Sequence, residues 1–301
     1  MRAIHRKLLR DLWEIKGQVI AIATVIGVGI AMFLAYLSTF NSLRGTQEAY
    51  YDRYRFADVF ANAKRVPLDV LDRIEQIPGV AQAEARVVAD VTLDVAGMEE
   101  PITGHLVSAP EVDRATLNDM ALLRGRYLEP GRGDEVLVTE GFADAHGIGP
   151  GDTVGAVING SRRELEIVGV ALSPEFVYSI RPGEMVADDA RYGIFWMGEK
   201  ALSNAFDMEG AFNDVLLRLL PGASIDEAID RLDRLLEPYG GRGAIPRRLQ
   251  TSHFFLDNEL RQLQGFGLAV PILFLAVAIF LLNVVLGRIV SVQREQIAAL
   301  K

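Results

Sequence analysis

The chain has 301 residues, a formal net charge of −9, four histidines and no cysteine. The acidic balance argues against a nucleic-acid-binding protein, because phosphate backbones are held by clustered Lys and Arg. Without cysteine there is no disulfide scaffold and no thiolate metal site. The histidines are scattered, and no P-loop sequence is present, so the chain is expected to bind no metal, nucleotide or other cofactor.

Two long stretches contain no Asp, Glu, Lys or Arg: residues 17–43 and residues 262–287. About 20 apolar residues in a helix cross the hydrocarbon layer of a membrane, so each stretch is long enough. We place the membrane helices at 18–40 and 267–287. The apolar core of the first runs too far for a cleaved signal peptide, which favours an uncleaved anchor.

Basic residues flank both stretches on their terminal sides. Five precede the first stretch and three follow the second: Arg2, Arg6, Lys7, Arg10 and Lys16, then Arg288, Arg294 and Lys301. Since Lys and Arg near helix ends stay cytoplasmic, we expect both termini inside a bacterial inner membrane and residues 41–266 outside it. The segment between the helices is strongly acidic, so it is not expected to lie flat on anionic lipid.

Small residues recur at every fourth position of the first membrane helix, at Ala23, Gly27, Ala31 and Ala35. Such a groove lets another helix approach closely, although Ala and Gly are also simply common in membrane helices. In the second helix, Asn283 is expected to hydrogen-bond to a neighbouring helix, because an unpaired amide is costly in lipid. These five residues are the predicted helix-packing positions.

The segments next to the membrane predict stalks at 41–55 and 251–266, and the second has an apolar helical stripe. If the second stalk continues into its membrane helix, the rod is about 75 Å long. Gly265 and Gly267 are its expected weak points, and Pro271 is expected to kink it. The first 17 residues predict a cytoplasmic amphipathic helix.

An internal repeat organises the outer domain, which we place at 56–250. Both copies carry F-x-D-V, then D-R-[IL], then a Pro/Gly stop. Strands are predicted at 56–65 and 212–220, and each is followed by a helix, at 67–80 and 224–240. Ser224 and Glu227 form a capping box in the second copy, whereas Pro67 suits the first turn of the first helix. Two β-α-β units of this kind predict a ferredoxin-like layer.

A small all-β subdomain is expected to interrupt this layer at about 120–175. Residues 135–171 alternate short strands with Gly/Pro/Asp turns, and Asn159-Gly160 is a strong two-residue hairpin signal. Strand-like sequence at 85–97, 102–109 and 192–198 is assigned instead to the ferredoxin-like layer. The fold class is thus membrane α plus extracytoplasmic α+β.

No constellation predicts catalysis, and the chain is not expected to be an enzyme. The glycine-rich run from Gly147 to Gly151 lies between a short helix and a strand, where it predicts a turn. Residues 173–197 are unusually rich in aromatic side chains. They either line a groove for an apolar ligand or partner, or pack a long loop onto its own domain.

Several short motifs occur in a recognisable order: LLRGR at 122–126, EVLV at 135–138, GPGD at 149–152 and VGV at 168–170. Together with the order of parts and with QREQIAALK after the second membrane helix, they resemble FtsX-like ABC transporter permeases of the MacB type. The runs SPEFVYSIRPGE and HFFLDNELRQL, at 173–184 and 253–263, resemble the long two-repeat permeases of this group. Such permeases continue with further membrane helices, so the sequence is expected to be an N-terminal fragment.

The resemblance implies a permease subunit that transmits motion from a separate cytoplasmic ATPase to the outer domain. That domain would act on a lipid, lipoprotein, peptide or efflux substrate. Implied partners are the ATPase, a periplasmic adaptor protein, a second permease copy or repeat, and membrane lipid. The cytoplasmic segment 288–301 would dock on the ATPase through Arg294, Glu295, Gln296, Ile297 and Leu300.

Two other classes share this architecture and remain open. One is a membrane sensor whose outer domain binds a ligand, and the other is a cell-envelope scaffold protein. The residues after the second helix discriminate the sensor from the permease, since a sensor would continue into a HAMP-like or coiled signalling helix, whereas QREQIAALK resembles a short coupling helix. The scaffold protein would differ only in lacking transport.

Overall fold

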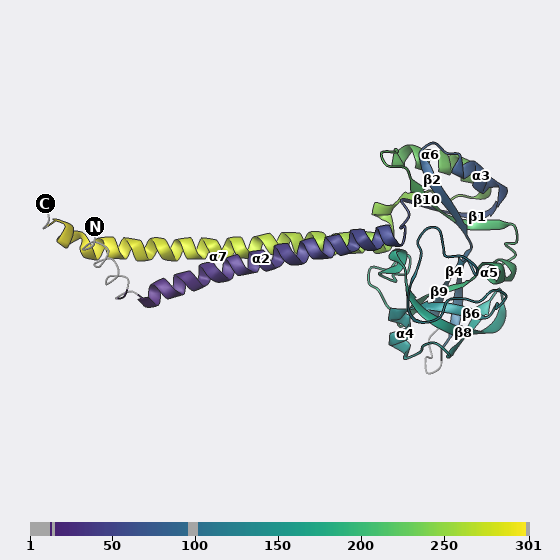
Figure 1. Cartoon of the computed structure of the whole chain (residues 1–301), viewed down its shortest axis with the longest axis horizontal. Helices are drawn as coiled ribbons and strands as arrows, with labels where there is room; N and C mark the ends of the chain where they lie inside the picture. The colour runs from purple at the N-terminus through teal and green to yellow at the C-terminus, as the bar shows by residue number, and fades with distance from the viewer. Residues whose placement is uncertain (1–12, 14–15, 96–101, 299–301) are drawn as a thin grey trace. The chain divides into compact units, whose positions relative to one another are not determined.

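A computed structural model of the chain describes residue 13 and residues 16–95 and 102–298 (Figure 1). Two compact units emerge: a helical unit made of Met1–Gln47 and Asn258–Lys301, and an outer domain made of Glu48–Asp257. The expected amphipathic helix at 1–17 falls almost entirely outside the described residues.

Two helices make up the described part of the helical unit: α2 (Lys16–Arg53) and α7 (Thr251–Ala298), of 38 and 48 residues. Lys16–Arg53 and Thr251–Arg288 are long and apolar enough to cross a membrane, with mean hydropathies of 2.4 and 2.8. Each predicted stalk is therefore continuous with its membrane stretch. Neither the two glycines nor Pro271 ends α7, because a helix in lipid keeps its remaining backbone hydrogen bonds internal.

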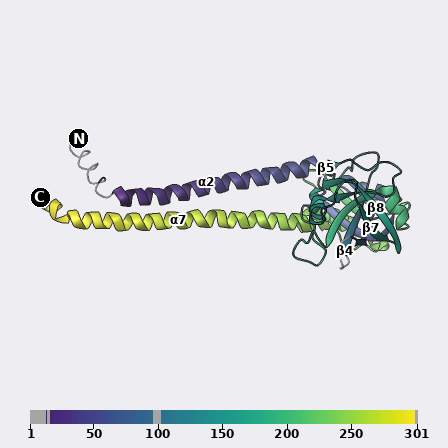
Figure 2. The same ribbon diagram turned by 90° about the horizontal axis from the view of Figure 1, so that it is seen from below.

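The two helices run antiparallel and side by side within this unit (Figures 1 and 2). The side of α2 that approaches α7 carries Ile22, Gly29 and Tyr36, seven residues apart. A Cβ on Gly29 would lie 3.2 Å from the Cβ of Phe274, and a Cβ on Gly267 would meet the Tyr36 ring. Heptad spacing keeps one face of a helix on its partner, and the glycines let the backbones come close.

One layer of the outer domain is a four-stranded sheet in the order β11-β1-β10-β2. Its elements are β1 (Val59–Pro67), α3 (Asp69–Glu75), β2 (Val80–Arg86), β10 (Ala211–Leu219), α6 (Ile225–Leu236) and β11 (Ile245–Pro246). A β-α-β-β-α-β order with the first and third strands in the centre is ferredoxin-like, which confirms the predicted fold class. Helices α3 and α6 share one core with one face of the sheet.

The helices of this layer are shorter than expected at their ends. Pro67 is the last residue of β1, so α3 begins two residues later. The Ser224 hydroxyl accepts a hydrogen bond from the Glu227 amide at 3.3 Å, as a capping residue does. Helix α6 then ends at Leu236, where the chain tightens into a 3-10 turn, Glu237–Tyr239, that contains a proline.

The second layer is a β-barrel inserted between β2 and β10. Its elements are β3 (Val88–Asp94), β4 (Ile102–Ala109), β5 (Ala121–Gly125), β6 (Glu135–Thr139), α4 (Glu140–His146), β7 (Thr153–Ile158), β8 (Ser161–Leu172), η1 (Pro174–Phe176), β9 (Tyr192–Gly198) and α5 (Glu199–Ala205). The sheet order is β5-β8-β6-β9-β4-β3-β7, and β7 also pairs with β8, which closes a ring of six strands. Closure leaves few free strand edges.

The inserted barrel includes more of the sequence than residues about 120–175, the range expected for it, because it extends from β3 to β9. Strands β3, β4 and β9 pair within it, although they were assigned to the ferredoxin-like layer. Their alternating pattern identifies strands but carries no information about which sheet they join. The hairpin at Asn159-Gly160 is confirmed: Ile158 pairs with Ser161, and both turn residues have positive φ.

Candidate functional site

The last turn of α2 and the first turn of α7 meet inside the outer domain. The Tyr51 hydroxyl lies 3.0 Å from Nδ1 of His253, and the Tyr51 ring centroid lies 4.6 Å from that of Phe56. Tyr51 and Phe56 are 7% and 1% exposed. We call the region built around this contact the stalk joint. It brings together residues about 200 positions apart in the chain.

Arg247, just before α7, fixes the strand that follows α2. Its guanidinium donates to the carbonyls of Ala57 and Phe56 at 2.7 and 2.5 Å and to Asp58 at 2.7 Å, and it lies over the Phe56 ring at 5.1 Å. The second oxygen of Asp58 accepts from the Leu219 amide at 2.8 Å. A guanidinium that bonds two carbonyls and a carboxylate holds both chain segments in one geometry.

The open face of the four-stranded sheet carries the joint. Phe60 of β1 and Leu216 of β10 pack with Leu117, Tyr51 and Phe56 in one buried cluster, and Leu256 of α7 lies against it. Because the other face of the sheet holds α3 and α6, the stalk ends occupy the remaining apolar surface.

Beside this apolar cluster lies a buried charged group centred on Arg86, the last residue of β2. Arg86 Nη1 and Nη2 donate to the two oxygens of Glu175 at 2.7 and 3.0 Å, and Nε donates to Asp214 at 2.7 Å. The three side chains are 7%, 10% and 7% exposed. Asn118 and Asn62 donate to Glu175 and Asp214, each at 2.7 Å. One buried cation thus serves two carboxylates.

The pKa values of the two carboxylates are shifted in opposite directions. Burial opposes the charge of Glu175, but the paired Arg86 guanidinium outweighs it and holds the pKa of Glu175 below its usual range. Burial raises the pKa of Asp214 above its usual range, since Arg86 offsets only part of that cost and Glu175 adds to it.

Glu175 also connects this charged group to α7. Its backbone carbonyl accepts a hydrogen bond from Gln250 Nε2 at 2.8 Å, while Gln250 Oε1 accepts from the His253 amide at 2.8 Å. Gln250 therefore caps the first turn of α7 and holds Glu175 at once. Two residues on, Ser252 Oγ accepts from the Tyr178 amide at 3.0 Å.

A model of the MacB-like periplasmic core domain matches residues 19–235 of this chain, which is well over half of it. The chain belongs to the MacB-like periplasmic core domain family. The resemblance to FtsX-like, MacB-type ABC transporter permeases is thereby confirmed, and the chain is a membrane protein with an extracytoplasmic domain. Its relatives are permease components of ABC transporters that work with an ATPase partner.

The solved structures that are similar to this chain include these three. The extracellular domain of the noncanonic ABC-type transporter YknZ from Gram-positive bacteria is 13% identical, with a TM-score of 0.40, covering 62% of this chain and 98% of that one. The periplasmic region of MacB from Actinobacillus actinomycetemcomitans is 10% identical, with a TM-score of 0.40, covering 67% and 91%. A domain of a putative permease from Porphyromonas gingivalis is 16% identical, with a TM-score of 0.38, covering 64% and 90%. No curated protein sequence matches.

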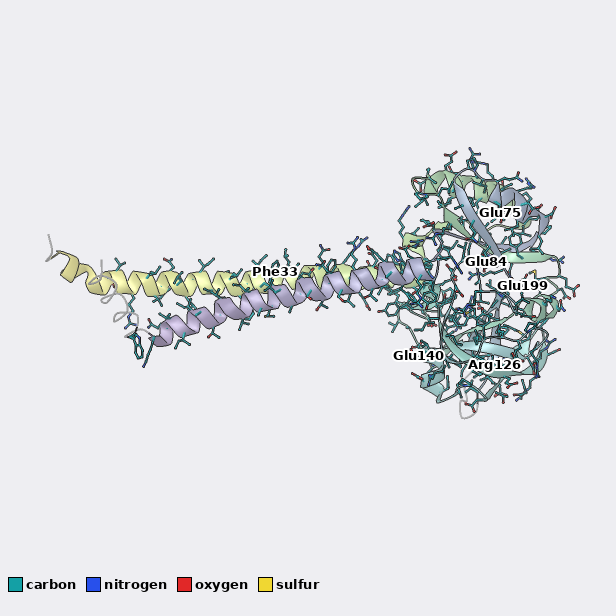
Figure 3. The ribbon with its side chains drawn as sticks, viewed as in Figure 1. Phe33, Glu75, Glu84, Arg126, Glu140 and Glu199 are labelled. Carbon is teal, nitrogen blue, oxygen red and sulfur yellow. The ribbon has the colours of Figure 1, made fainter. Side chains whose placement is uncertain are left out.

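The four short motifs of the MacB-like domain meet in one region of the barrel, where a Cβ on Gly125 would lie 2.8 Å from Cγ of Pro150 in GPGD. Arg126 Nη1 and Nη2 donate to the two carboxylate oxygens of Glu135 at 2.8 and 2.6 Å, and the Arg126 amide donates to the Val168 carbonyl at 2.9 Å. A Cβ on Gly169 would lie 2.5 Å from the Arg126 carbonyl oxygen. The hydrogen bonds from Arg126 hold the pKa of Glu135 below its usual range. Arg126 lies in the barrel, whereas Glu84 of β2 lies in the other layer (Figure 3).

The predicted helix-packing residues do not face α7. Ala23, Gly27, Ala31 and Ala35 are exposed in the helical unit, on a side of α2 away from Ile22 and Gly29, and Asn283 of α7 is exposed as well. The register between α2 and α7 is set by Gly29 and Gly267, each of which leaves room for an aromatic residue of the other helix. The recurrence of small residues at every fourth position does not indicate which face of α2 packs on α7. Packing of the five residues against another helix stays a prediction.

The predicted ATPase-docking residues lie at the end of the described chain. The backbone of α7 includes Arg294, Glu295, Gln296 and Ile297, whose side chains the structure does not describe, and Leu300 falls outside the described residues. Their role therefore stays a prediction.

The stalk joint itself was missed at the sequence level, although two signals pointed to it. The repeated F-x-D-V places Asp58 and Asp214 at equivalent positions, and each carboxylate accepts a hydrogen bond from an arginine side chain. The runs at 173–184 and 253–263 supply Glu175 and His253, and the Tyr178 amide of the first run donates to Ser252, the residue just before the second run. The first part of the aromatic segment 173–197 is thus packed into its own domain.

Proposed function

We propose that this chain is the permease subunit of an ABC transporter and passes ATP-driven motion from a cytoplasmic ATPase to its outer domain. The stalk joint carries the proposal. The ends of α2 and α7 bond to each other and to the four-stranded sheet, so a displacement of either end is passed to the domain rather than absorbed by a loose linker. The outer domain would act on a lipid, lipoprotein, peptide or efflux substrate.

The ATPase contact is proposed for the cytoplasmic end of α7. Arg294, Glu295 and Gln296 would bond to the ATPase surface, and Ile297 with Leu300 would form the apolar side of the same helix. Because α7 is a single helix of 48 residues from the joint to this end, it is a continuous rod of about 72 Å. Family analogy supports the ATPase as partner, and it leaves the substrate to experiment.

The decisive experiment measures ATP hydrolysis by the ATPase subunit reconstituted with the full-length permease. The double substitution Arg294→Ala with Glu295→Ala should reduce the stimulation on the order of tenfold, equivalent to about 1.4 kcal/mol of lost binding energy. The matched control is Arg163→Ala with Glu164→Ala, the same two residue types on the exposed start of β8, which should change nothing. Unaltered stimulation in the first variant would exclude the docking contact.

Topology is proposed from the basic flanks, with both termini cytoplasmic. Because the chain lacks cysteine, single cysteines introduced at Lys16 and at Arg163 can be labelled separately in whole cells. A membrane-impermeant maleimide should label the outer-domain position and leave the terminal one untouched. The reverse pattern would exclude this orientation and, with it, a cytoplasmic ATPase contact at the end of α7.

An adaptor protein, a second permease copy and membrane lipid are proposed as further partners on the family resemblance.

A further inference from the structure

Glu175 contacts three separate parts of the outer domain at once. Its carboxylate bonds Arg86 of the four-stranded sheet and Asn118 of the segment between β4 and β5. Its carbonyl accepts from Gln250, the residue that caps α7. It lies three residues after Leu172, the end of β8, so it is also joined covalently to the barrel.

Each of these connections is stiff. A guanidinium fork on a carboxylate fixes both distance and orientation, because two parallel hydrogen bonds must be kept together. The short helix η1 that holds Glu175 is capped by Ser173, whose hydroxyl accepts from the Glu175 amide at 3.3 Å. A small rotation of the first turn of α7 would therefore act on Gln250, then on Glu175, and through it on both layers.

We infer that Glu175 is a positioning residue, which, with Arg86 and Gln250, makes the sheet and the barrel move together with the first turn of α7. The inference rests on the proposed function, because such a coupling has a use only if α7 moves. The residue acts through the orientation of the elements that it joins.

The barrel offers a matched control for this role. Arg126 and Glu135 form a fork of the same kind, with the carboxylate 1% exposed, but both residues belong to the barrel side of the domain and neither hydrogen-bonds the stalk ends. Removing either fork should loosen packing. Of the two losses, only that of the Glu175 fork should loosen the hold of the first turn of α7 on the two layers.

The test uses the full chain in lipid nanodiscs, with pairs of introduced cysteines carrying spin labels. One label replaces Phe254, which is 47% exposed on α7, and its partner replaces exposed Ser161 in the barrel or exposed Arg234 on α6. Pulsed dipolar spectroscopy then gives the width of each distance distribution. Glu175→Gln should broaden both distributions, on the order of twofold in width, because one hydrogen bond replaces a charged fork. Glu135→Gln should leave both as in the native chain.

A second variant keeps the test open if Glu175→Gln does not fold. Gln250→Ala removes the hydrogen bond to the Glu175 carbonyl and should also broaden both distributions. Its control is Ser224→Ala, which deletes the cap of α6 and should leave the distances to α7 unchanged. Native widths in both Glu175→Gln and Gln250→Ala, or equal broadening in their controls, would overturn the inference.

The experiment needs neither ATP nor the ATPase, so the two hypotheses fail separately. A joint that behaves as expected in a chain that never stimulates an ATPase would refute the proposed function alone. Unchanged label distances in a permease that loses ATPase stimulation through Arg294 and Glu295 would refute the role of Glu175 alone.

Discussion

Two arginine–glutamate forks in the outer domain have almost the same geometry and different surroundings. Arg126 and Glu135 are nine positions apart in the chain, and Arg86 and Glu175 are 89 apart. The guanidinium side chain is 43% exposed in the barrel and 7% exposed at the stalk joint. The barrel fork closes a local loop in one layer, while the joint fork connects the four-stranded sheet to the segment that follows β8 of the barrel.

The difference shows how similar chemistry can serve stability in one place and position in another. A short-range fork restrains few degrees of freedom, so most of its effect is on the local packing of the barrel. A long-range, fully buried fork restrains the relative orientation of whole elements, and its partners are expensive to leave unpaired. Predictions that separate the two forks therefore test the comparison directly.

The largest expected effect comes from removing the shared cation. Arg86→Met leaves Glu175 and Asp214 buried without a counter-charge, which should lower the free energy of unfolding by about 3–5 kcal/mol. Arg126→Met should lower it by less, because the Arg126 guanidinium is largely solvated and Glu135 keeps the Glu129 amide as a donor at 3.0 Å. Denaturant unfolding of the full chain, followed by the fluorescence of buried Trp196, measures both. Equal losses would show that the deeper burial of the joint fork adds nothing to its contribution to stability.

A smaller effect is expected where the barrel fork is packed against backbone. Gly169→Ala would place a Cβ 2.5 Å from the Arg126 carbonyl oxygen, and overpacking of this kind costs about 1–3 kcal/mol. Gly149→Ala, in the neighbouring GPGD motif, is the control, since nothing lies within 4 Å of its Cβ. Thermal unfolding should separate the two variants. An unaffected Gly169→Ala variant would mean that the four motifs do not depend on this close approach.

The sequence predicted the local features well. The two uncharged stretches, the repeat that builds the ferredoxin-like layer and the Asn159-Gly160 hairpin all depend on neighbours within a few positions, where residue type restricts the backbone. The motifs around Arg126 and Glu135 were visible because their residues are close in the chain. Each of these features could be reasoned from periodicity, turn chemistry or a short pattern.

The stalk joint could not be predicted in the same way. Tyr51 and His253 lie 202 positions apart, and Arg86 ends a strand whose alternation of polar and apolar residues identifies a face without naming its partner. Glu175 belongs to the run SPEFVYSIRPGE, but nothing in that run specifies that its cation is Arg86. The boundary of the barrel was misjudged for the same reason, since strand patterns do not choose between two sheets.

The smallest and subtlest prediction concerns acidification, where the two sites should behave differently. The folded pKa of Glu135 lies below its unfolded value, so the stability that it supplies is lost as the pH falls through the folded pKa. The folded pKa of Asp214 is raised, so its charge destabilises the domain at neutral pH, and that cost disappears as the pH falls through the folded pKa.

The substitution Asp214→Asn isolates this term, because the amide can still accept from Asn62 or Arg86 but carries no charge. Relative to the native chain, the variant should lose its advantage, or become worse, as the pH is lowered from neutrality. Glu135→Gln should show the opposite trend, with its deficit shrinking in acid. Unfolding free energies measured across this range give both differences. A difference for Asp214→Asn that does not vary with pH would mean that one arginine satisfies both carboxylates of the joint in full, and the two forks would then be electrostatically alike.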